Sequence, residues 1–226
     1  MIQFWAMKRF FAHLKEPVNG LTHGASALLA LVGLVVLLIY SPPDWLSRAA
    51  LFAYGLSMVL LFSASSAYHL IKTTPERTLL LRKFDHTAIF LLIAGTYTPV
   101  CAIVLTGAWR WGMLAVIWAL AVIGITFRLF YMRGPRWLSV VIYMGMGWVG
   151  VLGFGQLFTV LPAAGIGWLV AGGVLYSLGA VIYATRRFDF YPGVFGFHEI
   201  WHLFVSAASA AHFVFVLAYV APAGLR

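Results

Sequence analysis

Charged residues are scarce in this chain of 226 residues. Only 9% of the residues are Asp, Glu, Lys or Arg, whereas 63% are hydrophobic and the mean hydropathy is +0.95. Soluble domains carry about 25% charged and about 45–50% apolar residues, so this chain has too little polar surface to cover a water-soluble globule. The composition excludes a disordered chain, a collagen, a coiled coil and a small secreted scaffold, and it predicts an integral membrane protein.

Cysteine is almost absent. The single cysteine, Cys101, excludes an internal disulfide and any metal site built from several thiolates. It lies inside an apolar run and is expected to be a small packing residue. The N-terminus also lacks a short apolar segment that ends in a small-residue cleavage site, so no cleaved signal peptide is expected.

Seven stretches are long and apolar enough to cross a bilayer as helices, since a span needs about 20 residues and unpaired backbone is too costly in lipid. They cover approximately residues 20–40, 47–71, 84–106, 111–131, 137–159, 163–184 and 197–220. We therefore expect an all-α fold, a seven-helix membrane bundle over residues 20–226. Residues 1–19 form a short tail, in which residues 3–15 are either an interfacial helix or disordered.

Basic residues give the chain a net charge of +9. They stand singly or in pairs beside apolar stretches rather than on one face, which argues against a nucleic-acid partner. Twelve of the fifteen Lys and Arg residues lie in the tail and in the second, fourth and sixth linkers. Because Lys and Arg favour the cytosolic side, the N-terminus is expected in the cytosol and the C-terminus outside.

Ionisable side chains inside the expected spans are the main functional signal, because such groups are costly in a bilayer. The expected topology puts His23, His69, Asp85, His198 and His202 near the cytosolic ends of four different spans. Isolated histidines tolerated one by one would not share a depth in this way. The convergence predicts a site at that end of the bundle.

The spacing of three histidines indicates a metal. His198 and His202 are four residues apart, which puts both imidazoles on one helix face, and His69 supplies a third nitrogen. Three histidines leave a tetrahedral Zn²⁺ one open position, the pattern of catalytic sites. Ser65 lies one turn from His69 and would orient a ligand or water, while Asp85 would hold or deprotonate that water or take a coordination place. The alternative is a polar contact that joins helices without a metal.

Two further motifs have weaker interpretations. Residues 198–202 read His-Glu-Ile-Trp-His, the zinc metalloprotease pattern, but Glu199 is rotated away from the shared histidine face and either acts as a base or pairs elsewhere. Residues 145–150 match the glycine pattern of dinucleotide sites, yet no strand precedes them. These glycines instead indicate close helix contact or a bent fifth span.

Three more histidines receive separate interpretations. His23 is either a hydrogen-bonding partner beside the site or a buried polar residue. His86 is expected to point to another face than Asp85. His212 lies ten residues beyond His202, about 15 Å along a helix, and cannot share the metal. A hydrolase triad of Ser65, His69 and Asp85 ranks below the metal site, because it leaves His198 and His202 unexplained.

Taken together, these motifs resemble the bacterial hemolysin III branch of the progestin and adipoQ receptor family. The likeness covers residues 16–215 and rests on four motifs in the family's order: Glu16-x₂-Asn19-x₃-His23, Ser65-x₃-His69, Lys83-Phe-Asp-His86 followed by residues 92–99, and His198-x₃-His202. The resemblance implies a multi-pass protein of the bacterial inner membrane, with zinc held by His69, His198 and His202 and with Asp85 and Ser65 beside the metal-bound water. It also implies a link to ceramidases and to membrane homeostasis. Hormone sensing is not implied, because the N-terminal tail is short.

We therefore expect a zinc-dependent hydrolase that acts on a lipid amide or ester, with membrane lipids as its partners. Two alternatives remain open. One is a non-catalytic sensor or regulator of the membrane in which zinc joins helices. The other is a pore-forming haemolysin, which the nearly charge-free cores of the fourth to sixth spans disfavour.

Overall fold

A computed structural model describes residues 14–131, 134, 136–191 and 194–225 of the chain. The segment at residues 3–15, expected to be either an interfacial helix or disordered, falls almost wholly outside the described residues. Within them the chain is helical, with a single isolated bridge between Tyr191 and Phe195 in place of any strand. The predicted all-α class is confirmed.

Seven segments of the described chain are long and apolar enough to cross a membrane. The helices that form them are as follows: α2 (Pro17–Ile39), α3 (Trp45–Leu70), α4 (Pro75–Pro99) continued by η1 (Val100–Val104), α5 (Gly107–Phe130), α6 (Arg136–Trp148) with η2 (Val149–Gly153) and α7 (Phe154–Val160), α8 (Ala163–Thr185), and α9 (Phe197–Phe215) continued by η3 (Val216–Val220) and η4 (Ala221–Leu225).

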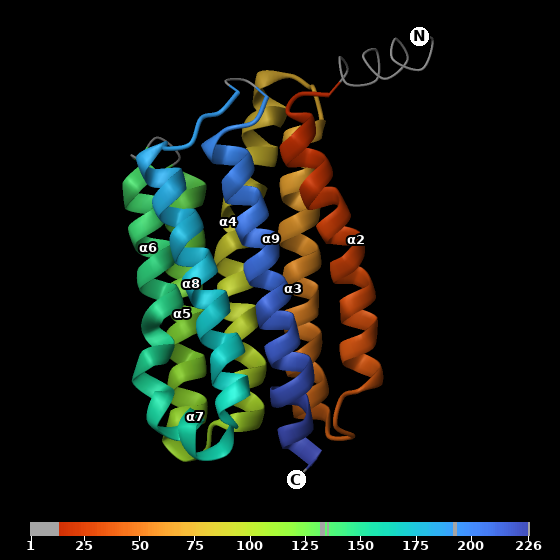
Figure 1. Cartoon of the computed structure of the whole chain (residues 1–226), viewed down its shortest axis with the longest axis vertical. Helices are drawn as coiled ribbons and strands as arrows, with labels where there is room; N and C mark the ends of the chain where they lie inside the picture. The colour runs from red at the N-terminus through yellow and green to blue at the C-terminus, as the bar shows by residue number, and fades with distance from the viewer. Residues whose placement is uncertain (1–13, 132–133, 135, 192–193, 226) are drawn as a thin grey trace.

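The helices form one upright bundle (Figure 1). Helix α3 lies between α2 and α4, while α9 contacts both α2 and α8. Because the number of spans is odd, the first and last spans run in the same direction, and the two ends of the described chain lie at opposite ends of the bundle. Which end faces the cytosol stays a prediction from the basic residues.

Helix α4 begins at Pro75, nine residues before the expected start of its span. Pro75 occupies the first turn, where a missing N–H costs nothing, and Thr74 caps the helix by accepting a hydrogen bond from the N–H of Arg77. The early start reflects these local signals, since the apolar pattern marks only the part of a helix that lies in lipid. At its other end, after Pro99, α4 continues as the π-helical turn η1.

The fifth span is interrupted, as its glycines predict. The α-helix changes to a 3₁₀ turn at Val149–Gly153 and resumes as α7. Tyr97 from α4 lies at the break, where its hydroxyl donates to the carbonyl of Gly147 at 2.5 Å and accepts from the N–H of Gly150 at 2.7 Å. The backbone groups released by the break are therefore satisfied inside the bundle, as a low-dielectric surrounding requires.

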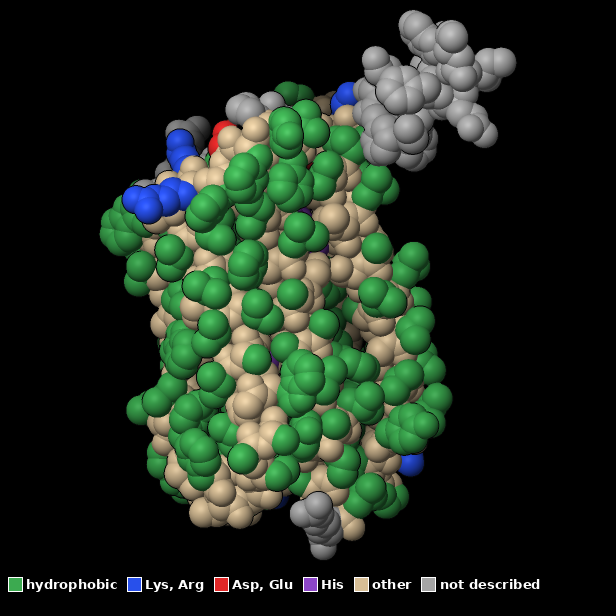
Figure 2. Space-filling view, in the orientation of Figure 1, with side chains coloured by type: hydrophobic (Ala, Val, Ile, Leu, Met, Phe, Trp, Pro, Cys, Tyr) green, Lys and Arg blue, Asp and Glu red, His purple; other side chains and the backbone are tan. Residues whose placement is uncertain are grey.

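The outward face of the bundle is apolar (Figure 2). Leu29 and Phe130 are 72% and 86% exposed, which suits side chains that meet lipid tails rather than water. The inner core joins the helices around Leu51, Tyr54 and Phe215, and Cys101 is fully buried in it, as expected of a packing residue.

Glycine allows the close approach of α4 and α5. A Cβ at Gly124 would overlap the ring of Phe90, which is 2% exposed and packs on Tyr143. We expect Gly124→Ala to lower the stability of the bundle by about 1–3 kcal/mol, the usual cost of overpacking. Gly112→Ala in the same helix is the matched control, because nothing lies within 4 Å of its Cβ position. Thermal unfolding in detergent measures both; equal melting temperatures for the two variants would contradict the prediction.

Candidate metal centre

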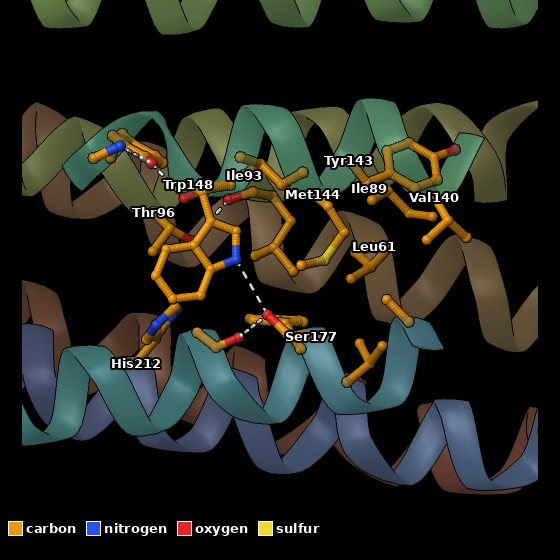
Figure 3. A pocket seen from close by; sticks show the side chains of 18 of the residues that line it. Leu61, Ile89, Ile93, Thr96, Val140, Tyr143, Met144, Trp148, Ser177 and His212 are labelled. Carbon is orange, nitrogen blue, oxygen red and sulfur yellow. Dashed lines mark hydrogen bonds between the residues drawn. The ribbon is translucent and has the colours of Figure 1, made fainter. Parts of the chain in front are cut away.

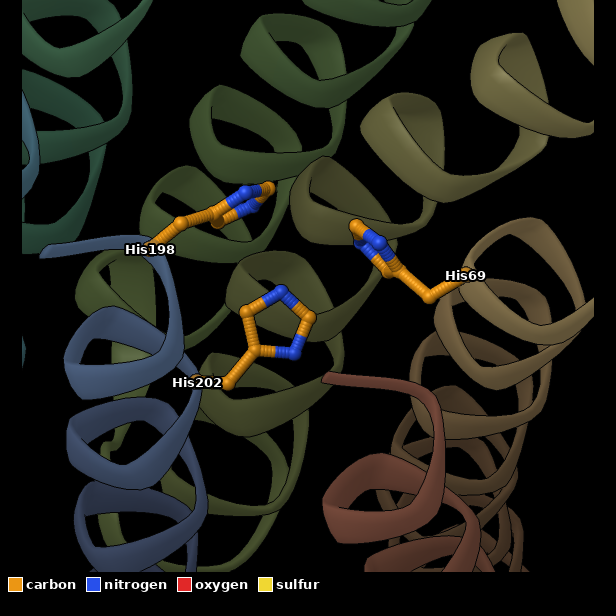
Figure 4. A group of neighbouring side chains, drawn as sticks. All are labelled: His69, His198 and His202. Atoms are coloured by element: carbon orange, nitrogen blue, oxygen red, sulfur yellow. The ribbon is translucent and has the colours of Figure 1, made fainter. Parts of the chain in front are cut away.

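Three histidines meet at the end of the bundle where α3 ends and α9 begins (Figure 4). His69 lies in the last turn of α3, and His198 and His202 lie in the first two turns of α9. Their ligand nitrogens all lie within 4.8 Å of one another. This limit is wider than the separation of about 3.4 Å that two nitrogens take on a tetrahedral zinc with Zn–N bonds of about 2.0–2.1 Å, so small side-chain rotations would bring them onto one ion. The three side chains can hold a metal ion.

The chemistry of the cluster fits a metal better than a simple polar contact. His69 and His202 are 1% and 2% exposed, and Nδ1 of His202 is buried without a hydrogen-bond partner. A buried ring nitrogen without a partner is costly. Neutral imidazoles are ordinary ligands of zinc and related ions, so a bound ion would remove that cost.

The cluster lies beside the acid and the hydroxyl that the sequence indicates. Asp85 in α4 is 9% exposed and Ser65 in α3 is 2% exposed. The Ser65 hydroxyl lies next to the Asp85 carboxyl, and both line a cavity that His198 and His202 also line. Asp85 is not part of the three-residue cluster, which favours a role next to the ion over one as its ligand.

The cavity runs from the histidines into the bundle and measures about 240 Å³. Its far end is lined by Leu105, Met113 and Leu157, whereas α4, α6 and α8 form much of its wall (Figure 3). Trp148 of α6 donates a hydrogen bond of 3.1 Å to Ser177 of α8 across this wall. A polar end with titratable groups and an apolar interior suit an elongated amphipathic ligand.

The remaining histidines divide as follows. His23 in α2 stacks on His202 with ring centres 3.9 Å apart and bonds its backbone carbonyl, so it supports a ligand without joining the cluster. His86 differs from expectation, because it lines the same cavity as Asp85 and bonds Arg82. His212 bonds the carbonyl of Leu169 and lies outside the cluster, as its distance along the helix predicts.

Glu199 is committed to other contacts. One carboxylate oxygen accepts from the amide of Asn19 at 2.8 Å, and the other accepts from the N–H of Gly196 at 2.8 Å, which caps α9. A metalloprotease of the His-Glu-x-x-His type needs this glutamate as a general base. The contacts of Glu199 therefore disfavour that interpretation.

The sequence predicts no role at the site for two residues that the structure places there. Arg128 counts among the basic residues of the fourth linker in the sequence, yet it is 5% exposed in α5 and lines the cavity, with Nε and Nη1 unpartnered. Its place one turn inside the apolar stretch is the signal that could have found it.

Glu16 is the second such residue. Its carboxylate accepts a hydrogen bond of 2.5 Å from Nδ1 of His69. Burial raises the pKa of the Glu16 carboxyl, but the hydrogen bond with His69 and the electrostatic attraction of His69 and Lys15 outweigh it and lower the pKa to about 2. A carboxylate accepts hydrogen bonds and donates none, so Nδ1 of His69 is the donor in this contact.

Seven apolar spans with a three-histidine cluster at one end, in which His69 and His202 are buried, define a polytopic membrane protein with a candidate metal centre. A family model described as haemolysin-III related matches residues 11–213. The chain is 40% identical over 219 residues to Hemolysin-3 of Bacillus cereus, which covers 96% of this chain and 97% of that protein.

Two other relatives agree. The Hemolysin-3 homolog of Bacillus subtilis is 36% identical over 92% of this chain and 96% of its own length. The human monocyte to macrophage differentiation factor is 27% identical over 91% of this chain and 84% of its own length. The chain belongs to the haemolysin III family and is an integral, multi-pass protein of the bacterial plasma membrane. The resemblance drawn from the motifs is confirmed.

The cluster generates a direct prediction. Detergent-purified protein should hold about one divalent metal ion per chain, and the double change His198→Ala with His202→Ala should abolish binding because two of three donors are lost. His212→Ala is the matched control in the same helix. Metal content by mass spectrometry is the measurement. In addition, saturating metal should raise the melting temperature of the wild type by ligand linkage. Equal metal content in the double variant and the control would refute the assignment.

Proposed function

We propose that the protein is a zinc-dependent hydrolase that cleaves an amide or ester bond of a membrane lipid. The observation that carries this proposal is the position of the three-histidine cluster at the polar mouth of an apolar cavity. An acyl chain would lie in the cavity, and the bond to be cleaved would lie at the histidines. The family membership supports the fold of this site, and the names of the relatives do not state a reaction.

His69, His198 and His202 would hold the ion. When bound, zinc supplies Lewis-acid polarisation of a carbonyl and lowers the pKa of water to about 7. Asp85 would accept the proton of the attacking water as general base and return it to the leaving group. Ser65, beside the Asp85 carboxyl, would fix the orientation of that carboxylate. Three protein nitrogens leave the open coordination position that such chemistry needs.

The buried guanidinium of Arg128 is a second, independent observation that favours an acyl substrate. Its guanidinium is buried at the cavity with two nitrogens unpartnered, and an uncompensated buried charge is costly. Hydrolysis of a lipid amide or ester releases a fatty acid, whose carboxylate is a natural partner for a guanidinium. Arg128 would therefore bind the carbonyl end of the substrate or the carboxylate of the product.

The role of Asp85 can be separated from that of the metal. Asp85→Asn should keep the zinc content and the melting temperature but lower turnover by about 10²–10⁴-fold, the usual contribution of a general base. The assay follows fatty acid release by mass spectrometry from a panel of N-acyl and O-acyl lipids in mixed micelles. The control is Asp44→Asn at the other end of α3, where asparagine also caps a helix and accepts from Ser47 as the aspartate does.

Two outcomes would count against the proposal. Full activity of Asp85→Asn would exclude Asp85 as the base. Bound zinc without release of fatty acid from any lipid of the panel, combined with a lower melting temperature after chelation, would favour a regulator in which zinc joins α3 and α9.

A further inference from the structure

The residues that lead into α2 lie across the ends of both helices that carry the histidine cluster. The backbone N–H groups of Lys15 and Glu16 donate to the carbonyls of Leu70 and His69 at 3.3 and 2.8 Å. The ammonium of Lys15 lies 3.6 Å above the ring of Tyr68 and bonds its carbonyl. This segment, residues 15–19, is therefore fastened to the last turn of α3 by main-chain and side-chain contacts.

Within the segment, Glu16 contacts a cluster histidine directly. Its carboxylate accepts from Nδ1 of His69 at 2.5 Å. Because a carboxylate has no proton to donate, Nδ1 carries the hydrogen and Nε2 keeps its lone pair. The contact thus selects the tautomer of His69 that can bind a metal through Nε2, and it fixes the rotation of the ring.

Asn19, one turn further along α2, extends the contact to the other helix. Its side-chain amide donates to Glu199 at 2.8 Å and lies 3.4 Å from the Glu16 carboxylate. Asn19 is 1% exposed, and Glu199 in turn holds the N–H of Gly196 at the start of α9. The spacing of Glu16 and Asn19 by three residues puts them on one side of the helix start, where one can reach α3 and the other α9.

We propose that Glu16 is a positioning residue of the metal centre, which holds His69 in its metal-binding tautomer and orientation, and that Asn19 links it through Glu199 to the helix of His198 and His202. This inference rests on the metal centre of the proposed function, but it assigns roles to residues that neither the metal nor a substrate touches. Metal-bound histidines commonly donate their second N–H to a carboxylate, and loss of such a partner weakens metal binding about 10–100-fold.

The test is the zinc affinity of detergent-purified, metal-free protein, measured by competition with a chelator of known affinity. Glu16→Ala should bind zinc about 10–100-fold more weakly than the wild type. Glu16→Gln should fall between them, because its amide oxygen still accepts the Nδ1 proton but carries no charge. Lys15→Ala is the comparison variant: it removes the contact with Tyr68 and the 3.7 Å ion pair with Glu16 but leaves the hydrogen bond between Glu16 and His69 in place, so its affinity should stay within about threefold of the wild type.

A second readout separates positioning from a general loosening of the segment. Cobalt(II) in place of zinc gives visible absorption bands that depend on ligand geometry. The bands should shift in Glu16→Ala and stay unchanged in Lys15→Ala, with similar melting temperatures for the two metal-free variants. If Glu16→Ala does not fold, Glu16→Gln carries the same comparison.

The outcomes are distinct. Unchanged zinc affinity in both Glu16 variants, or an equal loss in Glu16→Ala and Lys15→Ala, would overturn the positioning role while leaving the metal centre intact. A wild-type protein that binds no zinc would overturn the metal centre itself, and with it the proposed function.

Discussion

The cost of placing polar groups in a low-dielectric surrounding is the constraint on which this structure depends. The outward faces of the helices meet it by being apolar. The interior meets it by pairing many of its polar side chains, as in the contacts of Glu199 with Asn19 and Gly196. Against this background the buried polar atoms without a partner stand out, and three of them, Nδ1 of His202 and Nε and Nη1 of Arg128, belong to residues that line one cavity.

The same constraint explains why α2 matters although its long outer face is exposed. Its N-cap and first two turns contribute Glu16, Asn19 and His23, and each contacts either a cluster histidine or the helix start that carries two of them. The short approach between α2 and α3 at Gly20, where a Cβ would overlap Leu70, brings these side chains within reach. Helix α2 contributes no ligand to the cluster, yet its start contacts both helices that do.

Much of the fold could be predicted because the spans are read from local composition alone. The histidine cluster was also within reach, since span direction gives depth and a spacing of four residues gives a shared face. The contacts between helices could not be obtained in this way. Spacing shows which side of α5 carries Arg128 but not that this side faces a cavity, and it shows that Glu16 precedes a helix but not that the last turn of α3 lies against it. For His86 the sequence predicts a different helix face from that of Asp85. Both side chains nevertheless line the cavity, because the cavity is wide enough to reach both faces of α4.

The hydroxyl of Tyr97 has a consequence for the cavity wall. At the break in the fifth span it acts as donor and acceptor at once, the part that a water molecule would take in a soluble protein. Tyr97 also lines the cavity, so a protein side chain provides both hydrogen bonds at the open turn. The cavity wall can therefore contain a break in a helix without leaving these two backbone groups unpaired in an apolar surrounding. Such a break would let the wall bend to fit ligands of different length.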